Sequence, residues 1–267
     1  MDVNWGAVKI SVSTLLIGAL VTACGSAADT ASTEGETQSQ VVAGQDRTED
    51  SSATSETVEA EEPAAAADLQ VVDYGFTQLD GGEYGTPGVT YGVVVANNGS
   101  AIATDAQAQI TFKDANGVVV DTVEDYLSVV LPGTSVALGD YVYDAAGVES
   151  MTVQILPGSV EELEGEPANF TISNVTTREQ EFGGLKTTAT VASPFTRDLE
   201  DLYAVAIYRD GADKVIGGAF TFLGFVPAGG EAAVSIDSFA DGLPAPARTE
   251  VFIAFSGLTL LADMGNE

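Results

Sequence analysis

The sequence predicts an all-β protein with two similar β-sandwich modules, and three observations support this. Residues 107–113 (QAQITFK) alternate polar and apolar side chains, which is the period-two pattern of a half-buried antiparallel strand. Similar short runs continue from about residue 68, and turn residues separate them at intervals typical of sandwiches. The same series of runs then occurs a second time.

We expect strands in both copies of this series, read in chain order. In the first copy they lie at residues 69–76, 89–96, 107–113, 117–123, 135–140 and 150–156. In the second copy they lie at residues 170–175, 185–192, 202–208, 214–222, 232–236 and 249–255. The best helical candidate is SVEELEG at 159–165, expected as one or two turns within a connector.

The repeat fixes the expected domain organisation. Phe112 aligns with Tyr208, Asp114 with Asp210, and Pro132 with Pro227. Modules of about 90 residues have the size of an immunoglobulin-like sandwich. We therefore expect one module at 68–157, and a connector with the second module at 158–267.

A tight hairpin is expected at Asp114-Ala-Asn116-Gly117, where the carboxylate caps the turn and Gly117 adopts a positive φ. A calcium loop begins in a similar way, but its twelfth position would be Asp125, and a predicted strand lies between. We interpret this stretch, and the one beginning at Asp210, as turns.

These motifs resemble the FxLYD domain, a β-sandwich module of prokaryotic exported lipoproteins and surface proteins. The resembling features are a V-x-N-x-S strand end, an aromatic strand that runs into D-x-x-G, and a Pro-Gly before the next strand. The name-giving stretch appears as Ile110–Asp114 and Ala206–Asp210, with only the Asp strictly kept. The resemblance implies a sandwich fold and a non-catalytic role, and it carries no active-site residues.

The N-terminus is predicted to be a lipoprotein signal peptide, residues 1–23. Lys9 precedes an apolar run at 10–23, which is shorter than the roughly 17–25 residues that span a bilayer. The run ends in Val21-Thr22-Ala23-Cys24, which resembles a lipobox, so we expect cleavage between Ala23 and Cys24. An ordinary signal peptide that contains a cysteine, or an uncleaved anchor, stays open as an alternative.

Cys24 would then carry a diacylglyceryl thioether and acyl chains such as palmitate, and two or more chains anchor a protein stably. The expected location is the extracytoplasmic face of the cell membrane. Residues 24–67, rich in Ser, Thr, Ala, Gly and Glu, lack the apolar residues needed for a core and are expected to be a disordered acidic linker.

Composition excludes several classes of function. The chain has 9 basic and 40 acidic residues, a net charge of −31, no histidine and one cysteine. Nucleic-acid binding is not expected, because it needs a basic patch. Histidine-dependent catalysis and Cys- or His-based metal sites are excluded by the missing residues. The acidity fits either a halophilic host or an acidic exported protein, and both readings stay open.

The predicted function is non-catalytic binding or structural work at the cell envelope, with an envelope protein or polymer as partner and no cofactor. One alternative is calcium-dependent binding, with Asp198, Glu200 and Asp201 as oxygen ligands. The other is a carboxylate-based hydrolase with two carboxylates in an open cleft. The aromatics that suit a sugar platform, Tyr141 and Tyr143 or Phe220, Phe222 and Phe225, are expected in core or cross-strand packing.

Overall fold

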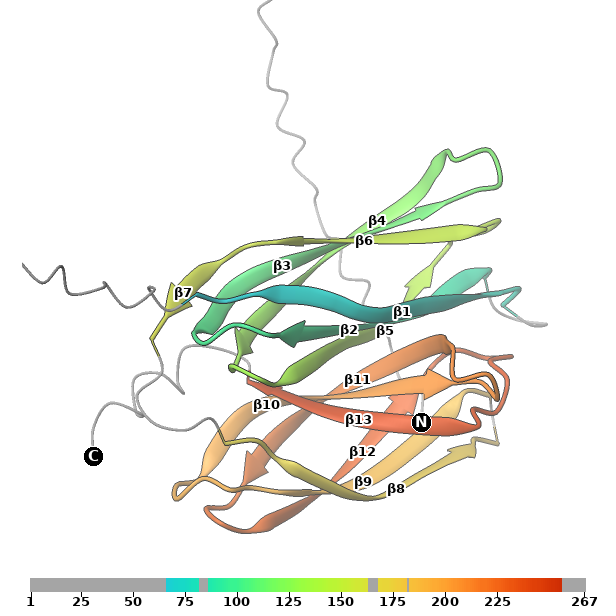
Figure 1. The fold of residues 1–267 in the computed structure, drawn as a ribbon. Coiled ribbons are helices and arrows are strands. Elements are labelled where there is room, and N and C mark those ends of the chain that lie inside the picture. The colour runs from blue at the N-terminus through green and yellow to red at the C-terminus, as the bar shows by residue number, and fades with distance from the viewer. Residues whose placement is uncertain (1–65, 82–85, 163–167, 182, 256–267) are drawn as a thin grey trace, which may run out of the picture. The chain divides into compact units, whose positions relative to one another are not determined.

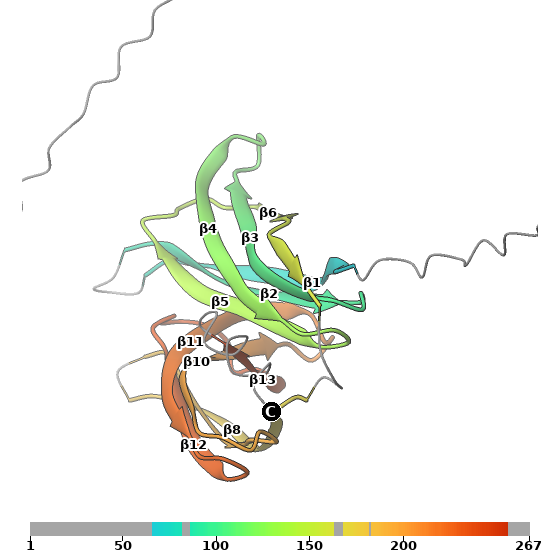
Figure 2. The same cartoon turned by 90° about the vertical axis from the view of Figure 1, so that its left-hand side faces the viewer.

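The structure, a computed structural model, describes residues 66–81, 86–162, 168–181 and 183–255. These residues form antiparallel strands and no helix, which confirms the all-β prediction (Figures 1 and 2). Accordingly, no helix in this part of the chain is long and apolar enough to cross a membrane. The predicted signal peptide, Cys24 and nearly all of the predicted linker lie outside the described residues. All the strands belong to the compact unit Ala60–Glu267.

The first sandwich consists of a β1-β2-β5 sheet and a β4-β3-β6 sheet, with β7 paired to β3. Its strands are β1 (Leu69–Leu79), β2 (Gly88–Asn97), β3 (Ile102–Lys113), β4 (Val119–Val130), β5 (Ser135–Tyr143), β6 (Ser150–Leu156) and β7 (Ser159–Glu161). The helical expectation for 159–165 is wrong at Ser159–Glu161, because the β3 edge offers free backbone partners and this segment pairs with it.

The second sandwich consists of a β12-β9-β8 sheet and a β11-β10-β13 sheet. Its strands are β8 (Thr171–Glu179), β9 (Leu185–Ala192), β10 (Leu199–Arg209), β11 (Val215–Val226), β12 (Glu231–Ser238) and β13 (Arg248–Phe255). Strand for strand, β8–β13 are paired as β1–β6 are, so the internal repeat of the sequence corresponds to a repeated topology.

The predicted hairpin turns are present in both sandwiches and use the same bonds. The Asp114 carboxylate accepts hydrogen bonds from the amides of Asn116 and Val118, each 2.8 Å long. The Asp210 carboxylate accepts them from Ala212 and Lys214 at 2.8 and 2.9 Å. These bonds also lower the pKa of Asp114, the Val118 amide contributing most. Both carboxylates therefore cap turns, as the sequence predicts.

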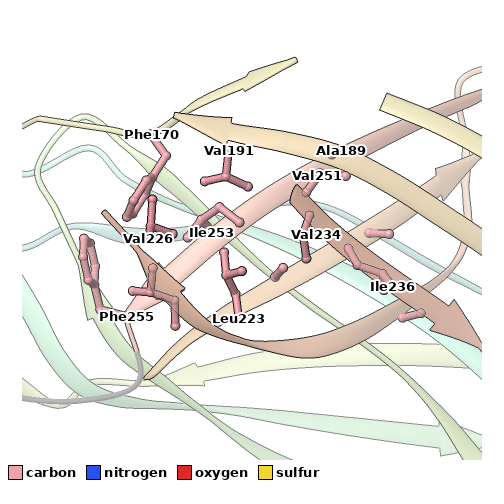
Figure 3. Close-up of a cluster of buried hydrophobic side chains, with 14 of the residues drawn as sticks. Phe170, Ala189, Val191, Leu223, Val226, Val234, Ile236, Val251, Ile253 and Phe255 are labelled. Atoms are coloured by element: carbon pink, nitrogen blue, oxygen red, sulfur yellow. The ribbon is translucent and has the colours of Figure 1, made fainter. Parts of the chain in front are cut away.

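Each sandwich has an apolar core between its two sheets. In the first, Ala108, Ile110 and Phe112 of β3 are fully buried, which confirms the alternation read in the sequence. Figure 3 shows the core of the second sandwich, where Val191 and Ile236 from one sheet meet Leu223 and Ile253 from the other. Dense packing of this kind leaves little space inside either sandwich at these positions.

The two sandwiches also pack against each other, with the β1-β2-β5 sheet facing the β11-β10-β13 sheet (Figure 1). A buried apolar cluster joins them, formed by Val94, Ala137, Val205, Ile207 and Val215. The backbones approach closely there: a Cβ added to Gly139 would lie 2.9 Å from the Gly218 Cα. As a result β2 and β10 are buried on both faces, unlike the half-buried strands that alternation predicts.

An ion-pair network lies across the same contact. The buried guanidinium of Arg209, on β10, donates to the carboxylates of Asp73 on β1 and Glu250 on β13. It also donates to the Asp213 carbonyl at 2.9 Å. A buried charge needs such partners to offset its desolvation, so this network favours one arrangement of the two sandwiches.

Candidate binding cleft

The acidic residues predicted as calcium ligands have other contacts in the structure. The Asp198 carboxylate accepts a hydrogen bond from the Ala228 amide at 2.9 Å. Asp201 has a φ of 53° on β10, between Glu200 and Leu202, which pair with Phe225 and Leu223 of β11. Within the described ranges no three Asp, Glu, Cys or His side chains gather in a way that could hold a metal ion.

A cleft of about 420 Å³ opens where the edge strands of the first sandwich meet the second. Its walls come from β4 and β5 on one side and from β10, β11 and β13 on the other. Figure 2 shows β4 and β5 above β10 and β11 on this side of the protein. Pockets of roughly 300–1,000 Å³ with mostly apolar walls and a few polar groups are the usual small-ligand sites.

A cluster of three aromatic rings lies on the wall contributed by the second sandwich, which also includes Val205, Ala254 and the buried Phe255. Tyr203 and Phe222 are cross-strand partners with centroids 4.9 Å apart and planes inclined by 45°. Phe220 lies 6.5 Å from Tyr203 and 6.0 Å from Phe222. Phe222 is 69% exposed. The core alternative for Phe220 and Phe222 is therefore wrong, because both lie on the sheet face outside the second core; the cross-strand alternative is confirmed.

The other sequence-predicted aromatics lie elsewhere. Tyr141 and Tyr143 contact each other edge-on, with centroids 4.7 Å apart, and Tyr143 is exposed. Phe225 is also exposed, three residues beyond Phe222 on β11, and it does not line the cleft. The structure thus brings Phe220 and Phe222 together with Tyr203 and separates them from the tyrosine pair.

Two carboxylates lie on the wall contributed by the first sandwich. Asp125 on β4 and Asp140 on β5 each accept a hydrogen bond from the amide of the following residue, at 2.8 and 2.7 Å. Desolvation raises the pKa of Asp125. Desolvation also raises the pKa of Asp140, and the charge of Asp125 raises it further. Both acids therefore carry a charge that their surroundings disfavour.

The repeat shows that one of these acids, Asp140, takes the place of a core residue. Asp140 pairs with Tyr91 on β2, as Ile236 pairs with Thr187 on the equivalent β9. Ile236 is fully buried in the second core. By the same register Asp125 corresponds to Thr221, which is half-buried, since Asp125 faces Ala108 as Thr221 faces Ala204. The first sandwich thus places one charge, Asp140, where the second has a core residue, and a second charge at a half-buried polar position.

Sequence reasoning missed Asp125, Asp140 and Tyr203 as site residues. A signal was present for the two acids: continuing the apolar alternation of Val123, Leu127 and Val129 places Asp125 on the inward face. Continuing the alternation of Val136 and Leu138 likewise places Asp140 on the inward face of its strand. An ionisable residue on an apolar strand face is a candidate functional residue.

Comparisons with known proteins give little guidance. No family model and no curated protein matches the chain. Among solved structures, the chain is similar to the N-terminal CBM22-1–CBM22-2 tandem domain from Paenibacillus barcinonensis Xyn10C, at 9% identity over 73% of this chain and 85% of that one. The TM-score is 0.15, so no argument is built on it.

The arrangement suits binding. The cleft offers exposed ring faces on one wall and carboxylates on the other, and no Lys or Arg is among the described residues that line it.

Proposed function

We propose that this protein is a membrane-anchored surface lipoprotein whose two sandwiches act together as one non-catalytic binding unit. The cleft between them is the binding site, and FxLYD-like modules are the structural units. The observation that carries the proposal is the aromatic wall of Tyr203, Phe220 and Phe222, which lies outside both filled cores beside two inward carboxylates. Exposed aromatic clusters in a concave site are typical of recognition surfaces.

The position of the two sandwiches supports a joint role. Neither sandwich forms the cleft alone, because the carboxylates come from the first and the rings from the second. The buried Arg209 network and the apolar cluster around Ile207 hold the two walls in register. A pre-organised site loses less conformational entropy when a ligand binds.

The binding role is tested by co-sedimentation of the Cys24→Ser chain with cell envelopes isolated from the host. Because this variant cannot be lipidated, retention would report binding by the sandwiches. Phe222→Ser should weaken binding at least about tenfold, the usual effect of losing one aromatic anchor. The matched control is Phe225→Ser, the same change at another exposed phenylalanine of the same strand, outside the cleft. Equal effects of the two variants would contradict the proposal.

The anchor is tested separately by detergent-phase partitioning of the full chain. Lipidation at Cys24 predicts recovery in the detergent phase, and Cys24→Ser should move the protein to the aqueous phase. Unchanged partitioning of the variant would contradict lipidation while leaving the cleft proposal intact.

A carboxylate-based hydrolase is the second candidate, favoured only by the pairing of Asp125 with Asp140 in an open cleft. Incubating the full chain with host envelope polymer and measuring released fragments separates the two functions. Release that Asp125→Asn and Asp140→Asn both abolish would support hydrolysis. We expect no release, because the proposed function is non-catalytic binding.

A further inference from the structure

We infer that the cleft binds a small organic cation, with an alkylammonium group held between the rings of the second sandwich and the carboxylates of the first. The inference rests on the proposed binding function and names the ligand class of that site. Three features carry it: the geometry of the rings, the uncompensated charge, and the size of the cleft.

The rings are spaced to share one cation. Tyr203, Phe220 and Phe222 have centroid separations of 4.9 to 6.5 Å and are mutually inclined. A cation within about 6 Å of a ring centroid is attracted by the negative face of the ring. Separations of this size allow one ammonium group to reach more than one ring. Inclined rings also surround a rounded group better than they cover a flat one.

The charge of the cleft is one-sided. Within the part of the chain that the structure describes, neither Asp125 nor Asp140 forms an ion pair, and each accepts a hydrogen bond from the amide of the following residue. Glu124 adds a third carboxylate at the rim and accepts a hydrogen bond from Gln109 at 3.3 Å. A ligand cation would compensate charges that the protein itself leaves unpaired.

An organic cation fits this site better than a metal ion. Calcium takes six to eight oxygen ligands, and magnesium needs near-octahedral oxygen coordination. The described residues of the cleft do not gather three acidic side chains around one point. Apolar rings on the opposite wall cannot replace the water of a metal ion, whereas they suit the methyl or methylene groups of an alkylammonium. The volume of about 420 Å³ matches a small molecule.

The test compares two probes of nearly equal shape, choline and its uncharged isostere 3,3-dimethyl-1-butanol, titrated into the full chain and followed by NMR and calorimetry. Choline should bind at least about tenfold more tightly than the isostere. Phe222→Leu, and the double change Asp125→Asn with Asp140→Asn, should each weaken choline binding to a similar extent. Affinity should also fall as salt is raised from 0.1 to 1 M (about 10 to 3 Å screening length).

The control variants are Phe225→Leu and Glu200→Gln, which alter an aromatic and an acid outside the cleft and should leave choline binding unchanged. Equal binding of the two probes at the cleft would overturn the inference and leave the binding function standing, since a neutral ligand such as a sugar would then be favoured. The inference is also overturned, and the binding function again stands, if Phe222→Ser loses envelope binding while the unchanged chain does not bind choline.

Discussion

The two sandwiches share one topology, yet their equivalent outer faces differ in character. The outer face of the β11-β10-β13 sheet is apolar, and part of it packs against the first sandwich; its residues are Tyr203, Val205, Ile207, Phe220, Phe222 and Phe252. The equivalent positions of the β4-β3-β6 sheet are Gln107, Gln109, Thr111, Glu124, Tyr126 and Gln154. Five of these six side chains are polar, and the sixth is Tyr126, which lines the cleft.

The other two equivalent sheets, β1-β2-β5 and β12-β9-β8, also differ in their outer faces. The outer face of the β1-β2-β5 sheet is small and apolar where it meets the second sandwich, with Gly92, Val94, Ala137 and Gly139. The equivalent positions on the β12-β9-β8 sheet are Thr188, Thr190, Ala233 and Ser235. The contact between the sandwiches joins two different faces, one from each sandwich. Heterologous contacts of this kind can add further copies without limit. Polar residues on the two free faces stop the stack at two sandwiches.

The largest expected effect comes from blocking the close approach of the two sheets. Gly139→Val places a side chain against the Gly218 backbone, where even a Cβ would lie 2.9 Å from the Gly218 Cα. We expect a loss of about 3 kcal/mol in the free energy of unfolding of the full chain, measured by urea denaturation. Ser235→Val, at the equivalent position of the free face, should change it by less than about 0.5 kcal/mol. Similar losses in both variants would mean that the contact does not depend on this glycine.

The next effect concerns the buried cation at the contact. Arg209→Met leaves Asp73 without its partner and leaves Glu250 paired only with Arg248, so the free energy of unfolding should fall by about 2–3 kcal/mol. This is below the full cost of a broken buried pair because both carboxylates are partly exposed, at 38% and 30%. Lys113→Met, at the equivalent position of the first sandwich, is the control and should be close to neutral. A neutral Arg209 variant would show that the network contributes nothing measurable.

A smaller effect is expected when an apolar and a polar residue are exchanged at equivalent positions of the two sandwiches, Ile207 and Thr111. Ile207 is fully buried between the sandwiches, so Ile207→Thr should cost about 1–2 kcal/mol through lost apolar area and a buried hydroxyl. Thr111→Ile makes the reverse change on the free face and should leave the monomer equally stable. Light scattering of Thr111→Ile would show whether an apolar free face promotes stacking of chains. Equal stability of the two variants would contradict the assigned contact.

The smallest effect concerns two acids of the first sandwich whose pKa values are shifted in opposite directions. The pKa of Asp125 is raised in the folded state, so its charge destabilises folding above the folded pKa. The penalty vanishes below the unfolded value of about 4, where the carboxyl is protonated in both states. Asp125→Asn should therefore raise the Tm slightly at pH 7.5 and leave it unchanged near pH 3. Asp114→Asn should act in the opposite sense, because the pKa of Asp114 is lowered: it should reduce the Tm at neutral pH, with the difference shrinking in acid. A Tm gain for Asp125→Asn that persists at pH 3 would point to packing instead of charge.

Local patterns were sufficient to predict much of the fold. Alternation in 107–113 correctly assigned the inward face of β3, because one side of that strand faces water and the other a core. The turn at Asp114 followed from side-chain chemistry that acts within four residues. The connector at 159–165 was harder, because whether it forms a helical turn or a strand depends on a free edge of β3, which a local pattern does not contain.

The binding cleft was only partly predictable. Phe220 and Phe222 were recognisable as a candidate platform, but their spacing along β11 suits a core as well as a surface. Tyr203 joins them only through pairing with β11, and the acids of β4 and β5 face them only because the two sandwiches pack together.

By itself, the sequence determined the all-β class, the repeated order of strands and turns, the excluded chemistries, and the prediction of a lipid anchor at Cys24. These follow from local periodicity, turn residues and composition, which act over a few residues or over the chain as a whole. Only the tertiary structure decided which outer faces meet and which acids and rings share a cleft. Those depend on residues far apart in the chain, such as Gly139 with Gly218 and Asp140 with Phe222, which become neighbours only after two sheets have packed.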